Sequence, residues 1–173
     1  MVDKLLRLLV RLPGLYRLLA FLTARRAIVR GWSMYPTLAP GERALFDRLA
    51  YRLGAPARGE VVLAGHYARP GLLLVKRVAG LPGDTVAMDG DRCWVNGLRL
   101  GAEPEDGAPP PGRLLGDDEY LLLGDAPDFS TDSRELGPAR RVEIQARGWM
   151  VYWPVQRMRS LVKQPEGETE GQT

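Results

Sequence analysis

Hydrophobic positions follow two different patterns along the chain, and the first pattern occupies the N-terminal segment. Leu5–Ala24 is rich in leucine, but three arginines and a Pro-Gly pair interrupt it. At 100° per residue, Lys4, Arg7, Arg11 and Gly14 fall on one narrow stripe, and apolar side chains cover the rest of the surface. This pattern predicts an amphipathic helix with a basic stripe along one side.

The basic stripe decides how residues 1–29 can meet a membrane. The segment lacks the roughly 18 uninterrupted apolar residues of a clean spanning helix, and each arginine at the bilayer centre costs about 2.5–3.5 kcal/mol on insertion scales. We therefore expect a membrane-associated segment that lies in the interface and is attracted to anionic lipid. A span with snorkelled arginines, a helix packed on its own domain or on a partner, and a targeting presequence stay open as alternatives.

After residue 30, short apolar runs of strand length alternate with Gly, Pro and Asp. This texture is typical of a mostly antiparallel β fold. Asp47–Leu53 is the single helical candidate in this part of the chain. The predicted strands are Arg43–Phe46, Glu60–Leu63, Leu72–Ala79, Thr85–Met88, Cys93–Val95, Tyr120–Leu123 and Gly148–Tyr152.

Turn and loop residues divide this second part further. Asp89-Gly90 and Asn96-Gly97 are strong hairpin signals, because the favoured two-residue turn needs positive φ at its central positions. Gly101–Gly116 is rich in Pro and Gly and predicts a loop. The polar segment 164–173 is expected to be a disordered tail.

Composition and charge narrow the class of protein. Hydrophobic residues make up 45% and charged residues 26% of the chain, which is the balance of one folded domain that needs no disulfide. The single cysteine, Cys93, can form no internal bridge and is expected in a partly buried strand. Residues 1–30 hold seven basic residues and one acid, so they carry +6 while the rest of the chain carries −3. The body therefore offers no basic patch in sequence, and we expect no nucleic-acid partner.

Lys76 stands out because lysine is scarce. The chain has 24 basic residues, of which only Lys4, Lys76 and Lys163 are lysines. Lys76 lies in the apolar run Leu72–Ala79, and in a strand it shares a face with its apolar neighbours two residues away. Burial of that kind lowers the pKa of an amine toward the range of a working base, which arginine cannot reach. The alternative is a lysine that snorkels from an edge strand.

Ser33 is the candidate nucleophile. It lies just before an X-Pro turn, on irregular backbone whose N–H is free to stabilise an oxyanion. The other serines are Ser130, Ser133 and Ser160, and a Ser-His-Asp triad would have to use the single histidine, His66, from a turn-like stretch where a plain surface residue is more common. A lone His and a lone Cys cannot build an ordinary zinc site, so no metal and no cofactor are expected.

Four motifs occur in the order in which they stand in type I signal peptidases, and the chain resembles this family from about Gly31 to Pro154. The first is Ser33-Met-Tyr-Pro-Thr-Leu38, and the second is Arg58-Gly-Glu-Val-Val62. The third is Lys76-Arg-Val-Ala-Gly-Leu-Pro-Gly-Asp84. The fourth runs from Gly124 to Pro138 and contains Ser130-Thr-Asp-Ser-Arg134. One short motif could arise by chance, but four in family order are highly specific.

The resemblance implies a serine endopeptidase with a Ser/Lys dyad. Ser33 would be the nucleophile and neutral Lys76 the general base. Ser130 would orient the Lys76 amine, and Asp132 and Arg134 would pair and hold that loop in place. These three are expected as supporting residues, although a loop ion pair without catalytic effect is the alternative for the last two.

The resemblance also implies the architecture. The catalytic core would be an antiparallel β structure formed by 30–84 and 118–163. A small β subdomain would be inserted at 85–117, after a membrane-associated helix in 1–29.

The implied partners are pre-protein signal peptides with small residues at the cleavage site, and membrane lipid. The implied location is the cell membrane, with the catalytic domain on the extracytoplasmic side. Trp32, Met34 and the Trp149–Trp153 region would either face the bilayer as an apolar surface or belong to the core.

This chain departs from the family pattern at several positions. Ala126 stands where an asparagine is common, and Glu60 replaces the commoner aspartate. Gly31 stands where some members place a serine that helps the oxyanion hole, so backbone donors such as the Ser33 N–H would form it here. The interrupted N-terminal segment differs from the usual clean anchor.

Three other functions remain as hypotheses. A specialised maturation peptidase with one dedicated precursor would use the same dyad. A self-cleaving repressor would need a DNA-binding domain, for which the 30 residues before the core leave no room. A non-enzymatic membrane-bound module is disfavoured by the presence of both Ser33 and Lys76.

Overall fold

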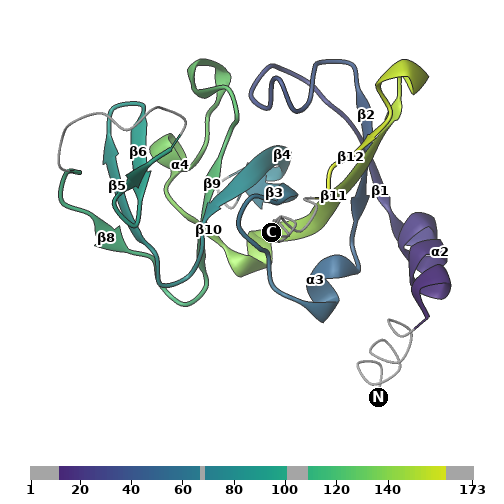
Figure 1. Ribbon diagram of the computed structural model, residues 1–173, viewed down its shortest axis with the longest axis horizontal. Coiled ribbons are helices and arrows are strands. Elements are labelled where there is room, and N and C mark those ends of the chain that lie inside the picture. The colour runs from purple at the N-terminus through teal and green to yellow at the C-terminus, as the bar shows by residue number, and fades with distance from the viewer. Residues whose placement is uncertain (1–11, 67–68, 101–108, 163–173) are drawn as a thin grey trace, which may run out of the picture.

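The computed structural model describes residues 12–66, 69–100 and 109–162 of the chain. Two antiparallel sheets dominate the described residues, with the smaller sheet at one end of the molecule and an N-terminal helix at the other (Figure 1). The mostly β fold predicted from the sequence is confirmed. The expected tail at 164–173 and residues 101–108 of the expected loop lie outside the described residues.

The larger sheet has eight strands within the described residues, in the order β1-β2-β11-β3-β4-β9-β10, with β12 paired to β11. Its neighbours are antiparallel, and β11 from late in the chain lies between β2 and β3. The strands are β1 (Arg25–Ile28), β2 (Arg43–Asp47), β3 (Val61–His66), β4 (Arg69–Gly80), β9 (Glu119–Leu123), β10 (Ala139–Arg140), β11 (Ile144–Trp153) and β12 (Arg159–Ser160).

The smaller sheet has the order β7-β6-β5-β8 in the described part of the chain. Its strands are β5 (Thr85–Asp89), β6 (Arg92–Val95), β7 (Leu98–Arg99) and β8 (Arg113–Leu114). Both predicted hairpin turns are confirmed, since Gly90, Asn96 and Gly97 have positive φ between paired strands. β8 falls inside the stretch that the sequence indicated as a loop, because two residues are too short a strand to leave a pattern.

Short helices connect the strands, and their positions differ from the sequence prediction. α3 covers only Ala50–Leu53 of the candidate Asp47–Leu53, because Asp47 still belongs to β2 and its carboxylate accepts from the N–H groups of Leu49 and Ala50. The sequence did not predict the remaining short helices. They are α4 (Ser133–Leu136), η1 (Pro127–Phe129), η2 (Arg141–Glu143) and η3 (Val155–Arg157).

α2 (Pro13–Thr23) is the described part of the predicted N-terminal helix. It begins at a proline, whose missing N–H would have no partner within the first turn of a helix. Tyr16 donates a hydrogen bond to Asp47 of β2, and Ala20 is buried. One side of α2 therefore packs on the larger sheet.

The opposite side of α2 is apolar and exposed. The exposed side chains there are Leu15, Leu18, Phe21 and Leu22. The basic stripe expected along this segment falls mainly on residues 1–11, outside the described residues. No helix in the described ranges combines the length and the apolar character needed to cross a membrane.

β3 lies at the centre of the core and is buried on both faces. Val61 and Leu63 pack with Met34 and Phe46 in one hydrophobic cluster. Val62 and Ala64, on the other face of β3, pack with Val78, Tyr120 and Leu122 in a second cluster. A third cluster joins the smaller sheet to β9 and contains Val86, Cys93, Val95, Leu115, Leu121 and Leu123. The two sheets are therefore fixed to each other through β9.

Candidate active site

Lys76 lies in β4, directly before the residue at which this strand begins to pair with β9 as well as with β3. It pairs with Val62, and the next residue, Arg77, begins the pairing with β9. Only 3% of Lys76 is exposed. Burial lowers the pKa of the Lys76 amine because the ammonium loses its hydration, and the charge of Asp132 opposes this in part. The amine therefore gives up its proton at a lower pH than an ordinary lysine does.

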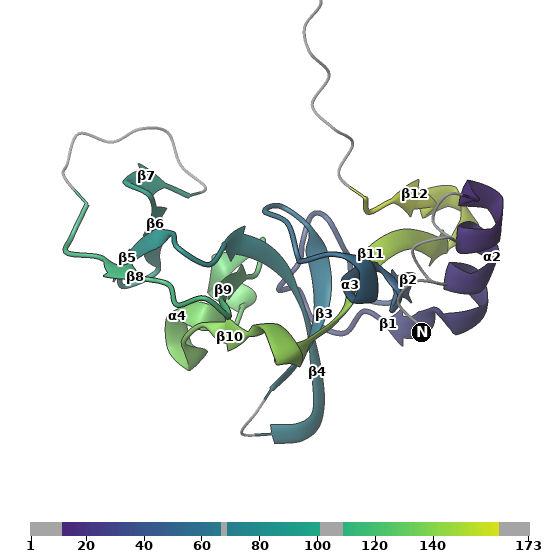
Figure 2. The same ribbon diagram turned by 90° about the horizontal axis from the view of Figure 1, so that it is seen from below.

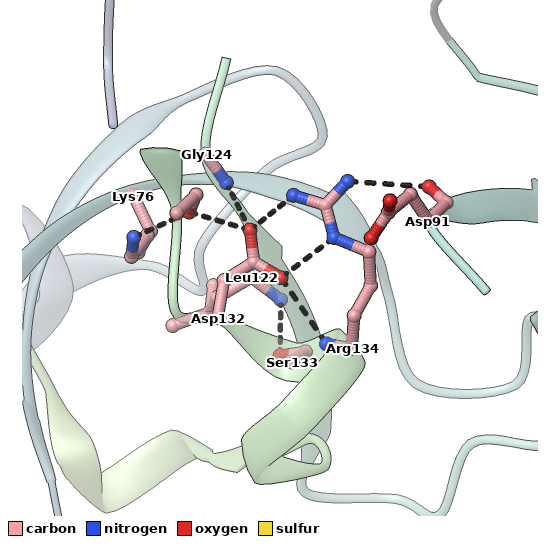
Figure 3. Close-up of polar contacts among 8 residues, drawn as sticks. Lys76, Asp91, Leu122, Gly124, Asp132, Ser133 and Arg134 are labelled. Carbon is pink, nitrogen blue, oxygen red and sulfur yellow. Dashed lines mark hydrogen bonds and ion pairs between the residues drawn. The ribbon is translucent and has the colours of Figure 1, made fainter. Parts of the chain in front are cut away.

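A chain of hydrogen bonds joins the Lys76 amine to the loop after β9 (Figure 3). Lys76 Nζ donates to Ser130 Oγ at 2.7 Å, and the Ser130 hydroxyl donates to Asp132 Oδ2 at 2.6 Å. Because the Ser130 proton is directed at Asp132, the lone pairs of Ser130 remain to accept from the amine. The contact holds the end of a long, flexible side chain in one place.

Asp132 is the buried anchor of this loop. Its carboxylate accepts from the Gly124 N–H at 2.8 Å, from Ser130, and from Arg134 Nη2 at 2.6 Å. Burial alone would raise the pKa of Asp132, but the hydrogen bonds from Arg134, Gly124 and Ser130 outweigh it and hold the pKa below its usual value. Asp132 also caps α4 by accepting from the Arg134 N–H.

Arg134 connects this loop to the smaller sheet. Its side chain is only 8% exposed. While one side of the guanidinium bonds Asp132, Nη1 donates to the carbonyl oxygen of Asp91 at 3.3 Å, at the turn between β5 and β6 (Figure 3). The line of contacts from Lys76 therefore ends on the smaller sheet.

Ser33 lies in the irregular segment between β1 and β2 and is half-buried. Its carbonyl oxygen accepts from the Ala126 N–H at 3.1 Å, which ties the Ser33 segment to the loop after β9. Among the described residues, the Ser33 N–H has no hydrogen-bond acceptor. It is the kind of free backbone donor that an oxyanion needs.

Gly124 makes room where these segments meet. A Cβ at this position would come within 2.2 Å of Ser130 Oγ and 2.5 Å of the Ser33 carbonyl oxygen. Only a residue without a side chain lets the two serine-bearing segments approach each other so closely.

Ser33 and Lys76 line the same groove, whose volume is about 420 Å³. One wall is the segment 25–30, which includes β1, and the other is 73–76 of β4; Met34 and Leu63 contribute apolar surface. In the described part of the chain, β1 ends the order of the sheet, and β9 pairs with β4 only from Arg77 onward. Both walls thus present unpaired strand edges to the groove.

Comparison with known proteins places the chain in a family. The family model described as "Signal peptidase, peptidase S26" matches residues 3–153, most of the chain. The chain belongs to this signal peptidase family. The family that the four sequence motifs indicated is therefore confirmed, and it is a family of serine endopeptidases that remove signal peptides.

Curated relatives agree with the family assignment. "Probable signal peptidase I-2" of Synechocystis sp. is 34% identical over 151 residues, 79% of this chain and 66% of that protein. "Signal peptidase I P" of Bacillus subtilis subsp. natto is 34% identical over 152 residues, 76% of this chain and 78% of that protein. The matched chain thus spans about two thirds of the Synechocystis protein. A solved signal peptidase I from Enterococcus faecalis is similar at 21% identity and a TM-score of 0.41, covering 54% of this chain and 97% of its own.

The departures from the signal peptidase pattern have structural substitutes. At Ala126 the loop is held by the backbone N–H to the Ser33 carbonyl, which needs no side-chain amide. Glu60 accepts hydrogen bonds from Tyr51 Oη at 2.7 Å and from the Ala57 N–H at 3.0 Å. The Ala126 contact therefore ties the loop after β9 to the Ser33 segment, and Glu60 stabilises the segment that follows α3.

Arg77 makes a contact that the sequence analysis missed. Its guanidinium bonds both carboxylate oxygens of Asp125 at 2.7 Å and also donates to Thr37 Oγ1 at 2.9 Å and to the Gly59 carbonyl at 2.8 Å. One side chain thus joins parts of all four motifs. Each of these residues lay inside a quoted motif, but a linear motif does not show which of its members meet.

Two further expectations concern apolar surface and cysteine. Trp32 is 51% exposed, whereas Met34 is 1% exposed and packs in the core, so the core alternative holds for Met34. Cys93 is buried in β6, and burial raises the pKa of its thiol to about 11. No cluster of three or more side chains that could hold a metal ion occurs in the described ranges.

Proposed function

We propose that this chain cleaves N-terminal signal peptides from exported pre-proteins, with Ser33 as nucleophile and Lys76 as general base. The observation that carries the proposal is that a buried lysine, held by a hydroxyl, lines the same groove as a half-buried serine. Family membership supports the reaction type. The assignment of the two residues rests on this geometry and on the motifs.

The reaction uses the Lys76 amine twice. Neutral Lys76 takes the proton as Ser33 Oγ attacks the scissile carbonyl, and the resulting ammonium returns that proton to the departing amine of the mature protein. This leaves an ester of Ser33 with the signal peptide. A water that loses its proton to Lys76 then hydrolyses the ester, and the proton returns to Ser33 Oγ. Ser130, Asp132 and Arg134 act as positioning residues for the amine.

Backbone hydrogen bonding suits the oxyanion that forms during both attacks. The Ser33 N–H is free of any acceptor among the described residues, and it belongs to the same residue as the attacking oxygen. Such a preorganised donor stabilises charge only as it develops. Gly31 supplies no side chain for this purpose, so the donor set relies on the backbone.

The groove suits an extended peptide. A substrate strand lying between the edges of β1 and β4 would gain main-chain hydrogen bonds from one wall or both, as in strand addition. Met34 and Leu63 line the groove beside Ser33, and such apolar walls favour uncharged, apolar side chains next to the scissile bond. The preference for small residues flanking the cleavage site rests on family membership.

Membrane association is the second part of the proposal. The exposed leucines of α2 would lie in the lipid interface, with the catalytic core on the extracytoplasmic side where exported precursors emerge. The domains would then be a membrane-associated segment at 1–29, a core of 30–84 and 118–163, and an inserted sheet at 85–117. The larger sheet itself already begins at Arg25, since β1 pairs with β2.

The test is cleavage of a purified pre-protein by the purified full chain, followed by N-terminal sequencing of the product. We expect one new N-terminus directly after a small-x-small sequence, and no product with Ser33→Ala. A wild-type chain that leaves a panel of pre-proteins intact would contradict the proposal. Cleavage of a single member of the panel would instead favour a maturation peptidase with a dedicated precursor.

A further inference from the structure

A basic pocket of about 400 Å³ lies away from the peptidase groove, between α2, α3 and the start of β11. Figure 2 shows α3 beside β11, and α2 at the end of the molecule near β12. Arg48, Arg52 and Arg141 line the pocket, and none of its described lining residues is a carboxylate. Thr23, at the end of α2, forms part of its wall.

Two of these arginines have no partner in the described part of the chain. Arg48 and Arg52 are exposed, and the side chain of neither makes a hydrogen bond, ion pair or ring contact with another described residue. Arg52 belongs to α3, whereas Arg48 precedes Ala50, the first residue of that helix, by two positions. Both line the pocket, so they bring two like charges to the same place. Surface arginines that lack acidic neighbours are free to bind an external anion.

The third arginine is fixed in place without being neutralised. Arg141 donates to the backbone carbonyls of Tyr51, at 2.6 Å, and of Ile144, at 3.2 Å. Its guanidinium also lies over the Tyr51 ring, 5.2 Å from the centroid. Carbonyl groups and an aromatic face orient the cation but leave its full charge in the pocket.

Asp47, Glu60 and Glu143 are carboxylates close to α3 or to the pocket in the chain, and each accepts hydrogen bonds from groups other than the pocket arginines. Asp47 accepts from Tyr16 and from the first N–H groups of the α3 turn. Glu60 accepts from Tyr51 Oη, and Glu143 accepts from the Arg140 N–H. On the open side, Arg25 donates to Gln145 Oε1 at 3.2 Å, which brings a fourth guanidinium to the rim, since Gln145 lines the pocket.

We propose that this pocket binds the phosphate group of an anionic membrane lipid. Guanidinium groups match phosphate in shape and charge, and several of them converge here. The exposed leucines of α2 are adjacent in the chain to the pocket wall at Thr23, so a headgroup and an apolar interface are available together. Neither Ser33 nor Lys76 lines the pocket, so the inference does not depend on the proposed cleavage reaction.

The experiment measures partitioning of the full chain onto vesicles of phosphatidylcholine alone and of equimolar phosphatidylcholine and phosphatidylglycerol. The variant is Arg48→Gln/Arg52→Gln. Each basic residue at an anionic surface contributes about fivefold to partitioning, so the double variant should bind the anionic vesicles about 25-fold more weakly. Arg92→Gln/Arg113→Gln removes the same two charges from the smaller sheet and should change little.

Each result decides the matter. Weaker vesicle partitioning of the pocket variant alone supports the proposal. Equal losses in both double variants would show that net charge alone drives partitioning and would overturn the proposal. Unchanged partitioning of both variants would overturn it as well. Titration with glycerol 3-phosphate and inorganic phosphate, followed by NMR, tests the other source. Soluble phosphate binding that depends on Arg48 and Arg52, with vesicle partitioning unchanged, would overturn the lipid assignment.

Peptide cleavage provides the separate control. The pocket variant should cleave a short soluble peptide as fast as the wild type, which would show that its fold is intact. If the wild type cleaves no peptide, the proposed function fails while the vesicle comparison still stands on its own.

Discussion

The Lys76 amine lies 2.7 Å from the Ser130 hydroxyl, although the two residues are 54 positions apart in the chain. The contact joins β4 to the loop after β9, and Asp132 holds the second member of the pair at 2.6 Å. The position of the Lys76 amine therefore depends on the loop after β9, which contains Ser130 and Asp132. Five predictions test what this arrangement and its neighbours do.

Replacing Lys76 by arginine should abolish cleavage. Arg keeps the positive charge but cannot lose its proton, and removal of a general base costs about 10²–10⁴-fold in rate. The measurement is kcat on a signal-peptide substrate, with thermal unfolding as the control for folding. Wild-type turnover by a folded Lys76→Arg variant would refute the base assignment.

Asp132→Asn should move the pH profile as well as the rate. If Lys76 is the base, it must be neutral to act, so kcat/KM should rise with pH through the lysine pKa, which burial lowers. The Asp132 charge raises that pKa, so removing it should shift the rising limb to lower pH while kcat falls, because a neutral amide oxygen accepts more weakly from Ser130 than the carboxylate does. A purely structural role for Asp132 would lower activity without moving the limb.

Lys76→Met should stabilise the protein most at low pH. The buried lysine has a lowered pKa, so between the folded and unfolded pKa values the unfolded chain binds more protons and the wild type gains stability as pH rises. Methionine removes that dependence. The gap in unfolding midpoint between variant and wild type should therefore shrink as pH approaches the unfolded lysine value of about 10.4. A gap that is constant with pH would mean that Lys76 is not buried as an amine.

Gly124→Ala should damage both stability and activity. The new methyl group would overlap Ser130 Oγ and the Ser33 carbonyl, and overpacking of this kind costs about 1–3 kcal/mol. The separation of the two serine segments should also reduce kcat. Gly54→Ala is the matched control, since the nearest atom to its Cβ lies at 3.9 Å. Denaturant unfolding and kcat are measured on both, and equal effects would contradict the close approach at Gly124.

Arg77→Lys should slow cleavage although it keeps the charge. A lysine cannot bond both oxygens of Asp125 and also reach Thr37 and Gly59, so the segment after Ser33 would loosen relative to β4. Small displacements in an active site cost on the order of 10²-fold in rate. A double-mutant cycle with Asp125→Asn should show a coupling energy of about 0.5–3 kcal/mol in kcat/KM. Additive effects would show that the pair does not act as a unit.

The long apolar runs predicted the centre of the fold well. Leu72–Ala79 lies within β4, and Tyr120–Leu123 lies within β9. β9 is buried on both faces, which requires a continuous hydrophobic sequence, whereas residues 73–75 of β4 are half-buried. β1 gave no such signal, since Arg25 and Arg26 are exposed at the edge of the sheet and read as a continuation of the basic segment. Strands of two residues, such as β10 and β12, depend on their neighbours and have no pattern of their own.

The residues of the candidate site also differ in whether the sequence alone could single them out. Lys76 and Ser33 could be selected because scarcity and local backbone set them apart in the sequence. Gly124 and Arg77 could not, because their importance lies in distances of a few ångströms between segments that are far apart in the chain. The role of each selected residue in catalysis stays a prediction.

β4 carries Lys76 and Arg77 side by side, and neighbouring side chains on a strand point to opposite faces. Deletion of one residue before Lys76 would shift the register so that Arg77, which is permanently charged, would take the place of the proposed base, while insertion of one residue would place Val75 there. In either case the contacts of Arg77 with Asp125, Thr37 and Gly59 would be lost. We therefore expect this enzyme's evolution to tolerate changes of residue type along β4 far better than changes in its length.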